Sequence, residues 1–274
     1  MYQRLRNSMQ QFIDCYFATI AYYDRFDAVR YSMRQIVNCY RYNHIAAHVE
    51  KTEFLHVQLE REGYHSQYGQ DKWLIEKLFP SKEDGIFVDI GANDGITFSN
   101  TYLLEKMGWN GIAIEPISSV YEELKKNRHC VVIHGCVAPK SGKERFRVIT
   151  GSPQMLSGLV GEYDPRHKKR IESELDFYGG VYKEIEVDCY NLNELLESNG
   201  IFRVDFLSID VEGVEYKILD SIDFNRFHIA VIAVENNYLD YRIPQLLTRR
   251  GFEFHSVVGD EFYLNSNSEF WNPR

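Results

Sequence analysis

Hydrophobic positions divide the chain into two parts with different patterns. Residues 1–66 carry apolar side chains at helical spacing, as in Phe12, Tyr16, Ile20 and Tyr23, with no proline and Gly63 as their single glycine. Such spacing places an apolar stripe along one face of a helix. We therefore expect a helical N-terminal extension over 1–66 that packs on the main domain or on a second subunit, which makes it a candidate homodimer contact.

From residue 84 onward, short apolar runs alternate with helical patterns. The β-rich runs predict strands at residues 86–90, 111–115, 130–134, 204–210 and 229–235. The segments between them predict helices at residues 97–107, 120–127, 212–221 and 244–250. Continuous apolar strands separated by helices are typical of a parallel sheet that is covered on both faces.

Two further features belong to this α/β domain, which we expect to span residues 67–274. The runs "FEFHSVV" and "EFYLN", separated by Gly259 and Asp260, predict an antiparallel hairpin at the sheet edge. Residues 138–190 predict an insertion beside the strand ends, where specificity usually resides. Its basic stretch, residues 166–170, is typical of a solvated helix face, although at an active-site edge it could bind a phosphate or carboxylate of the acceptor.

Composition and charge limit the class of partner. The chain has 40 acidic and 31 basic residues, and its net charge of -9 offers no general attraction to nucleic acid or to an anionic membrane. Its five cysteines are odd in number and form no C-x-x-C pair, which favours a reducing cytoplasm. The longest aliphatic run, residues 229–234, is too short to span a bilayer. We expect a cytoplasmic protein without a membrane span and without nucleic acid as a partner.

The turn "VDIGANDG" after the first predicted strand carries the candidate chemistry. Ligands of open parallel sheets bind beyond the carboxyl ends of the strands, near this turn. A dinucleotide fingerprint counted from Gly91 needs glycine at Asn93 and Ile96, so a nicotinamide oxidoreductase is disfavoured. Glu115 ends the next strand and could accept both hydroxyls of a ribose, while Asp89 could offset a cationic group. A ribose-bearing ligand with a cationic amino acid part and no phosphate is S-adenosylmethionine; the alternative is that Glu115 only forms a salt bridge and Asp89 only caps a helix.

Three blocks of sequence resemble the FkbM-like family of S-adenosylmethionine-dependent methyltransferases. They are "SQYGQDKWLIEKLF" (66–79), "FVDIGANDGITFSNTYLLEKMGWNGIAIEP" (87–116) and "VDFLSIDVEGVEYKILDSIDF" (204–224), with a weaker fourth, "VIAVENN" (231–237). The resemblance implies a Rossmann-like class I methyltransferase sheet, mostly parallel with a C-terminal antiparallel hairpin. It also implies S-adenosylmethionine as cofactor and S-adenosylhomocysteine as product.

The resemblance further implies which residues surround the cofactor. Those expected to cover it or to line its methionine, ribose and adenine parts are Tyr68, Gln70, Asp89, Gly91, Asn93, Asp94, Gly95, Ser99, Asn100, Glu115, Pro116, Cys136, Val137 and Asp210. Helix capping would explain Ser99 and Asn100 equally well.

The candidate catalytic residues for methyl transfer follow the fourth and fifth predicted strands. The cofactor already carries the reactive methyl, so the protein must align the nucleophile and manage its proton. Asp210 is the candidate base or substrate-orienting acid, and its alternative role is to cap the next helix. Glu212 and Glu235 are the neighbouring candidates. Asp210 and Glu235 could also hold a divalent cation, and the spacing leaves metal use open.

These features predict a methyltransferase that acts on a hydroxyl. The range of the family makes a sugar unit of a surface glycan or glycosylated metabolite the expected acceptor. The alternatives are a hydroxyl of a polyketide-type natural product, an amine on a glycan modification, and a non-catalytic assembly subunit that retains the cofactor fold.

Overall fold

The computed structural model describes residues 55, 57–151 and 154–267. Most of the predicted helical extension, and with it the candidate homodimer contact, lies outside the described residues. Within the described part, no helix combines the length and the apolar character that a membrane crossing requires.

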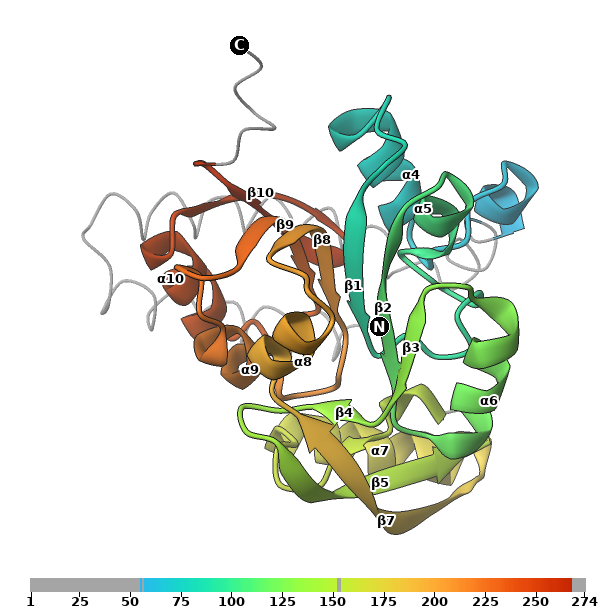
Figure 1. The fold of residues 1–274 in the computed structure, drawn as a ribbon. Coiled ribbons are helices and arrows are strands. Elements are labelled where there is room, and N and C mark those ends of the chain that lie inside the picture. Colours follow the sequence, from blue (N-terminus) through green and yellow to red (C-terminus); the bar gives the residue numbers. More distant parts are fainter. Residues whose placement is uncertain (1–54, 56, 152–153, 268–274) are drawn as a thin grey trace.

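A seven-stranded sheet forms the centre of the described chain (Figure 1). Its strand order is β10-β11-β9-β8-β1-β2-β3. The parallel strands are β1 (Ile86–Ile90), β2 (Asn110–Glu115), β3 (Val131–His134), β8 (Arg203–Ile209) and β9 (His228–Val234). The antiparallel hairpin consists of β10 (Phe252–Val258) and β11 (Asp260–Asn265), and β11 pairs with β9. The predicted Rossmann-like sheet with its C-terminal hairpin is confirmed.

Both faces of this sheet are buried, as the continuous apolar strands predict. On β1 and β8, Val88 and Leu207 belong to one hydrophobic cluster, whereas Phe87 and Phe206 belong to the cluster on the opposite face. The associated helices are α4 (Gln70–Trp73), the π-helix η1 (Leu74–Leu78), α5 (Tyr102–Lys106), α6 (Ser118–Asn127), α8 (Leu192–Ser198), α9 (Glu215–Ser221) and α10 (Arg242–Arg249).

A second sheet of four strands lies beyond the carboxyl end of β3, because its first strand begins two residues after β3 ends. Its strands, in the order β4-β7-β5-β6, are β4 (Cys136–Val137), β7 (Val181–Tyr190), β5 (Gly142–Thr150) and β6 (Gly158–Leu159). The short helix η2 (Gln154–Leu156) and the longer α7 (Pro165–Tyr178) belong to the same segment, and Figure 1 shows the group at one end of the central sheet.

Two helices begin later than the sequence predicts. Helix α5 begins at Tyr102 because the carboxylate of Asp94 binds the N–H groups of Ile96 and Thr97, and Phe98 has a φ of 58°. Helix α9 begins only at Glu215. It has no side-chain cap, so the alternative role of Asp210 as a helix cap is not observed.

A close contact between the ends of β1 and β8 fixes the geometry of the sheet edge. Gly91 has a φ of 90°, and a Cβ atom there would lie 1.9 Å from the carbonyl oxygen of Asp210. The N–H of Asp210 donates to the carbonyl of Ile90 at 3.0 Å, which holds the two segments together. Glycine is therefore required at this position for two independent reasons, its backbone conformation and the space available.

We expect Gly91→Ala to destabilise the protein severely. The left-handed conformation alone costs about 1–2 kcal/mol for alanine, and the contact with Asp210 would force the strand ends apart. Gly63→Ala is a matched control, because Gly63 has a φ of 89° but no atom within 4 Å of its added Cβ. Urea unfolding measures both variants. Equal losses of stability would contradict the importance of the contact with Asp210.

Candidate functional site

A cavity of about 350 Å³ opens at the carboxyl ends of the central strands. It is lined by the turn after β1, the ends of β2, β8 and β9, and parts of the second sheet. The predicted residues that line it are Tyr68, Gln70, Asp89, Gly91, Asn93, Ser99, Asn100, Glu115, Pro116, Cys136, Val137, Asp210, Glu212 and Glu235.

Two predicted residues, Asp94 and Gly95, shape the turn without lining the cavity. The carboxylate of Asp94 accepts hydrogen bonds from the N–H of Ile96 at 2.9 Å and from that of Thr97 at 2.7 Å. Gly95 packs against Arg128, whose Cγ would lie 2.7 Å from an added Cβ. Their part in the site is to set the path of the backbone.

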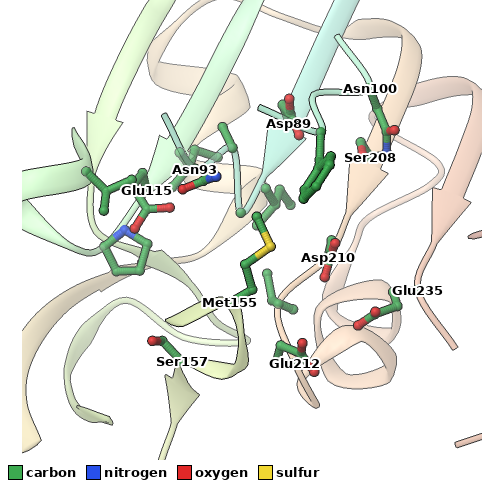
Figure 2. A pocket seen from close by; sticks show the side chains of 18 of the residues that line it. Asp89, Asn93, Asn100, Glu115, Met155, Ser157, Ser208, Asp210, Glu212 and Glu235 are labelled. Carbon is green, nitrogen blue, oxygen red and sulfur yellow. Dashed lines mark hydrogen bonds between the residues drawn. The ribbon is translucent and has the colours of Figure 1, made fainter. Parts of the chain in front are cut away.

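Glu115 lies at one end of the cavity, near Asn93 (Figure 2). Its side chain is buried, and one carboxylate oxygen accepts the N–H of Ile117 at 2.8 Å. Burial raises the pKa of Glu115 to about 7, while the backbone N–H groups of Ile117 and Asn93 lower it. A carboxylate held this way can accept hydrogen bonds from a diol.

Asp89 and Ser99 each accept a hydrogen bond from a residue at the start of α5. Asp89 is buried and accepts the hydroxyl of Thr101 at 2.5 Å. Burial raises its pKa, and the nearby guanidinium of Arg128 opposes this effect. The hydroxyl oxygen of Ser99 accepts the N–H of Tyr102 at 3.0 Å, a local contact just before α5, whose N-cap residue Thr101 makes no side-chain cap.

Asn100 belongs to a hydrogen-bonded group of polar side chains that the sequence did not reveal. Its amide nitrogen donates to Ser208 at 3.1 Å and to Asp260 at 3.2 Å, and Asp260 also accepts from Gln70 at 3.3 Å. Burial raises the pKa of Asp260 to about 7. Oδ1 of Asn100 is buried and has no hydrogen-bond partner in the described part of the chain. This oxygen suits a donor on a bound ligand, such as an ammonium group.

The other end of the cavity holds an acid cluster, formed by Asp210, Glu212 and Glu235 (Figure 2). One carboxylate oxygen from each lies within 4.8 Å of the others. Asp210 faces the open cavity although protein surrounds it, and burial raises its pKa, against the effect of a hydrogen bond with Glu235. Burial, followed by the charges of the neighbouring acids, raises the pKa values of Glu212 and Glu235 well above the ordinary value. These three acids therefore hold protons more readily than ordinary carboxylates, and at this separation they can share one.

The basic stretch of α7 is only partly a solvated helix face. Lys168 and Lys169 are exposed, as that prediction requires, but the side chain of His167 is fully buried. Burial lowers the pKa of His167, and its Nδ1 lies 3.2 Å from Oε2 of Glu212. Arg170 lines the cavity. The helical period of the stretch buries His167 and places Arg170 at the rim of the cavity, where its side chain stays partly exposed, and the sequence alone did not indicate which face packs inward.

A second cavity, of about 480 Å³, lies on the far side of the acid cluster. Glu212, Glu235 and Asn237 line both cavities. Most of the rest of its lining is polar or aromatic, including Tyr216, Tyr238, Tyr241, Asp240 and Arg242, beside the aliphatic Leu239 and Ile243. The two carboxylates thus lie on a wall that the two cavities share.

The buried acids make the stability of the ligand-free protein depend on pH. The pKa values of Glu115 and Asp260 are about 7 in the folded chain, against ordinary values of 4.5 and 3.8. The folded state retains protons that the unfolded chain has lost, so we expect the free energy of unfolding to fall as pH rises from about 5 to 8. Urea unfolding across this range measures the slope.

The double variant Glu115→Gln, Asp260→Asn isolates this effect. It should reduce the slope, whereas Glu122→Gln, at an exposed position, should not. The lowered pKa of His167 acts in the opposite direction at the acidic end, so the comparison between variants is decisive. An unchanged slope in the double variant would contradict the assignment.

Known proteins resemble this chain in sequence and, distantly, in structure. Residues 89–254 match the family described as the methyltransferase FkbM domain. "Methyltransferase 1" of Beauveria bassiana (strain ARSEF 2860) is 27% identical over 175 residues, which cover 61% of this chain and 69% of that protein. Two solved structures are each 12% identical. A TehB-like SAM-dependent methyltransferase from Corynebacterium glutamicum ATCC 13032 Kitasato has a TM-score of 0.35 and covers 80% of this chain and 96% of its own.

The second solved structure, the METTL16 MTase domain, has a TM-score of 0.38 and covers 71% of this chain and 64% of its own. These structural likenesses are remote, whereas the family match spans more than half of the chain and includes the β1 turn, Glu115 and the acid cluster. The chain belongs to the FkbM family of S-adenosylmethionine-dependent methyltransferases.

Proposed function

We propose that this protein transfers the methyl group of S-adenosylmethionine to a hydroxyl of a sugar unit, in a surface glycan or a glycosylated metabolite. The observation that carries the proposal is the placement of acids at opposite ends of one cavity. Glu115 lies at one end and the acid cluster at the other, with Met155 between them (Figure 2). Glu115 would hold the ribose diol, which directs the sulfonium methyl toward Asp210.

The reaction needs a proton acceptor at that second end. A new O–CH₃ bond forms as the S–CH₃ bond breaks, the sulfonium becomes a neutral thioether, and the hydroxyl proton passes to a carboxylate. Asp210 is the proposed base, and its contact with Glu235 allows the pair to share the proton. A positioned general base contributes typically ~10²- to 10⁴-fold.

The second cavity favours a polyhydroxyl acceptor over a flat apolar one. Its lining offers carboxylate and guanidinium groups from Asp240 and Arg242 beside the faces of Tyr216 and Tyr238. Asp240 and Arg242 form an ion pair beside the Tyr216 ring, and a sugar, which presents both hydroxyl groups and C–H faces, suits such a mixed surface better than a flat apolar alcohol. An amine acceptor would also suit an acidic cavity, so the acceptor atom must be tested directly.

Cofactor binding tests the first half of the proposal. We expect calorimetry to detect S-adenosylhomocysteine and S-adenosylmethionine but not NAD. Glu115→Gln should weaken binding by about tenfold to a hundredfold, since a hydrogen bond to a charged group is worth about 1.5–3 kcal/mol. The exposed Glu122→Gln is the control. Preferential binding of NAD would refute the assignment.

Turnover tests the second half. A panel of monosaccharides, nucleotide sugars, amino sugars and a polyketide-type alcohol, incubated with isotope-labelled cofactor, identifies the acceptor class and the methylated atom. With the acceptor found, Asp210→Asn should lower kcat by ~10²- to 10⁴-fold while S-adenosylhomocysteine binding changes little. Intact turnover in this variant would remove Asp210 from the role of base, and methylation of amines alone would reject the hydroxyl acceptor.

A further inference from the structure

The acid cluster has the geometry of a cation site. Asp210 follows β8 and Glu235 follows β9, while Glu212 reaches the same point from the loop before α9. Their oxygens lie within 4.8 Å of one another. Ca²⁺ binds oxygens at about 2.3–2.6 Å and Mg²⁺ at about 2.0–2.1 Å, so oxygens on opposite sides of either ion are roughly 4–5 Å apart. One ion can therefore contact all three carboxylates.

A second observation concerns Oε2 of Glu212, which lacks the donor that a buried carboxylate needs. The Glu212 side chain is 9% exposed, and Oε2 has no hydrogen-bond partner within the described residues. Its polar neighbour is Nδ1 of His167, 3.2 Å away. A buried carboxylate oxygen without a donor costs several kcal/mol unless a proton or a cation satisfies it.

The hydrogen bonds of His167 show why this neighbour does not satisfy Glu212. Nε2 lies 3.3 Å from the carbonyl of Leu156, which can only accept, so Nε2 carries the proton of the neutral ring. Nδ1 is then left as an acceptor, and it lies 3.1 Å from the hydroxyl of Tyr238. With the tautomer assigned from these partners, Oε2 of Glu212 faces a nitrogen lone pair. A positive ion would be attracted to this point.

The positive side chain at the cluster does not balance its charge. Arg170 lines the same cavity, but its Nε donates to Glu174 at 2.8 Å and its side chain is 43% exposed. One guanidinium that is shared with a fourth carboxylate cannot neutralise the three acids when they are ionised.

We propose that Asp210, Glu212 and Glu235 bind one hard divalent cation, of the Mg²⁺, Mn²⁺ or Ca²⁺ class, on the wall shared by the two cavities. The donors are all carboxylate oxygens, and such donors suit these hard ions better than they suit softer metals. Resting on the proposed function, the ion would also take an acceptor hydroxyl as ligand and lower its pKa, so that the proton passes to the oxygen of Asp210 that does not bind the ion. The acceptor would then carry two neighbouring oxygens, such as a vicinal diol, that can chelate the ion.

Binding of the metal alone tests the site without any acceptor. After removal of metal with a chelator, calorimetry with Mg²⁺, Mn²⁺ and Ca²⁺, and Mn²⁺ electron paramagnetic resonance, should show one ion per chain. Glu212→Gln and Glu235→Gln should each weaken binding by at least about tenfold, because losing even an outer-shell partner costs 10- to 100-fold. Glu162→Gln is the matched control, since Glu162 lines the second cavity but pairs with Lys217.

The outcomes separate this proposal from the proposed function. Circular dichroism and S-adenosylhomocysteine binding of each variant verify that it is folded. Absence of binding by all three ions at millimolar concentration, or unchanged affinity in either glutamine variant, would overturn the metal site even if the cofactor binds. Metal binding without cofactor binding would instead leave the site standing and reject the proposed function.

Discussion

The contact between Gly91 and the carbonyl of Asp210 is the constraint on which the site depends. It brings the ends of β1 and β8 together, and the neighbouring strands follow through hydrogen bonds from Ala92 to Ile114 and from Glu235 to Ile209. The last residues of four parallel strands are thereby fixed at one level. Glu115, Asp210 and Glu235 come from distant parts of the sequence, yet their separation is set by backbone pairing. Rigid strands hold such groups more accurately than long loops would.

The acidity of the cavity is the second organising feature. Glu115 and Asp260 are buried, and the acid cluster lines the cavity with few cationic partners near it, so the raised pKa values of these groups favour their protonated, neutral forms. This arrangement is unfavourable for stability at alkaline pH. The same acids favour the binding of a cationic ligand, because the sulfonium and ammonium groups of the cofactor would supply the positive charge that the cavity lacks.

The sequence predicted the parts of the structure that depend on local pattern. The five central strands and the hairpin follow from continuous apolar runs and a glycine turn, and Glu115 follows from its place at a strand end. The starts of α5 and α9 were wrong because Phe98 and Glu212 adopt left-handed conformations. Neither residue type favours that conformation. At Phe98 it accompanies a long-range bridge to Ser66, which no local pattern reveals.

His167 and Asp260 could not be placed from sequence for a related reason. His167 stands in a basic run and would look exposed, but Tyr163 stacks on its ring and Tyr238 contacts its nitrogen. Asp260 sits in a hairpin turn, where aspartate is common, and only the fold brings it to Asn100. In both cases the role depends on contacts between segments far apart in the chain.

On the proposed function, the second sheet and the acid cluster would together restrict how an acceptor reaches the methyl group. Met155, Leu156 and Ser157, from η2 and the residue after it, line the first cavity, and Met155 lies between Glu115 and Asp210 in Figure 2. The second cavity meets the first at Glu212, Glu235 and Asn237. On the proposed function, an acceptor held in the second cavity would approach the methyl group past the carboxylates. The residues proposed to receive its proton are the same ones that it would pass, so entry, orientation and deprotonation of the acceptor would all depend on one cluster.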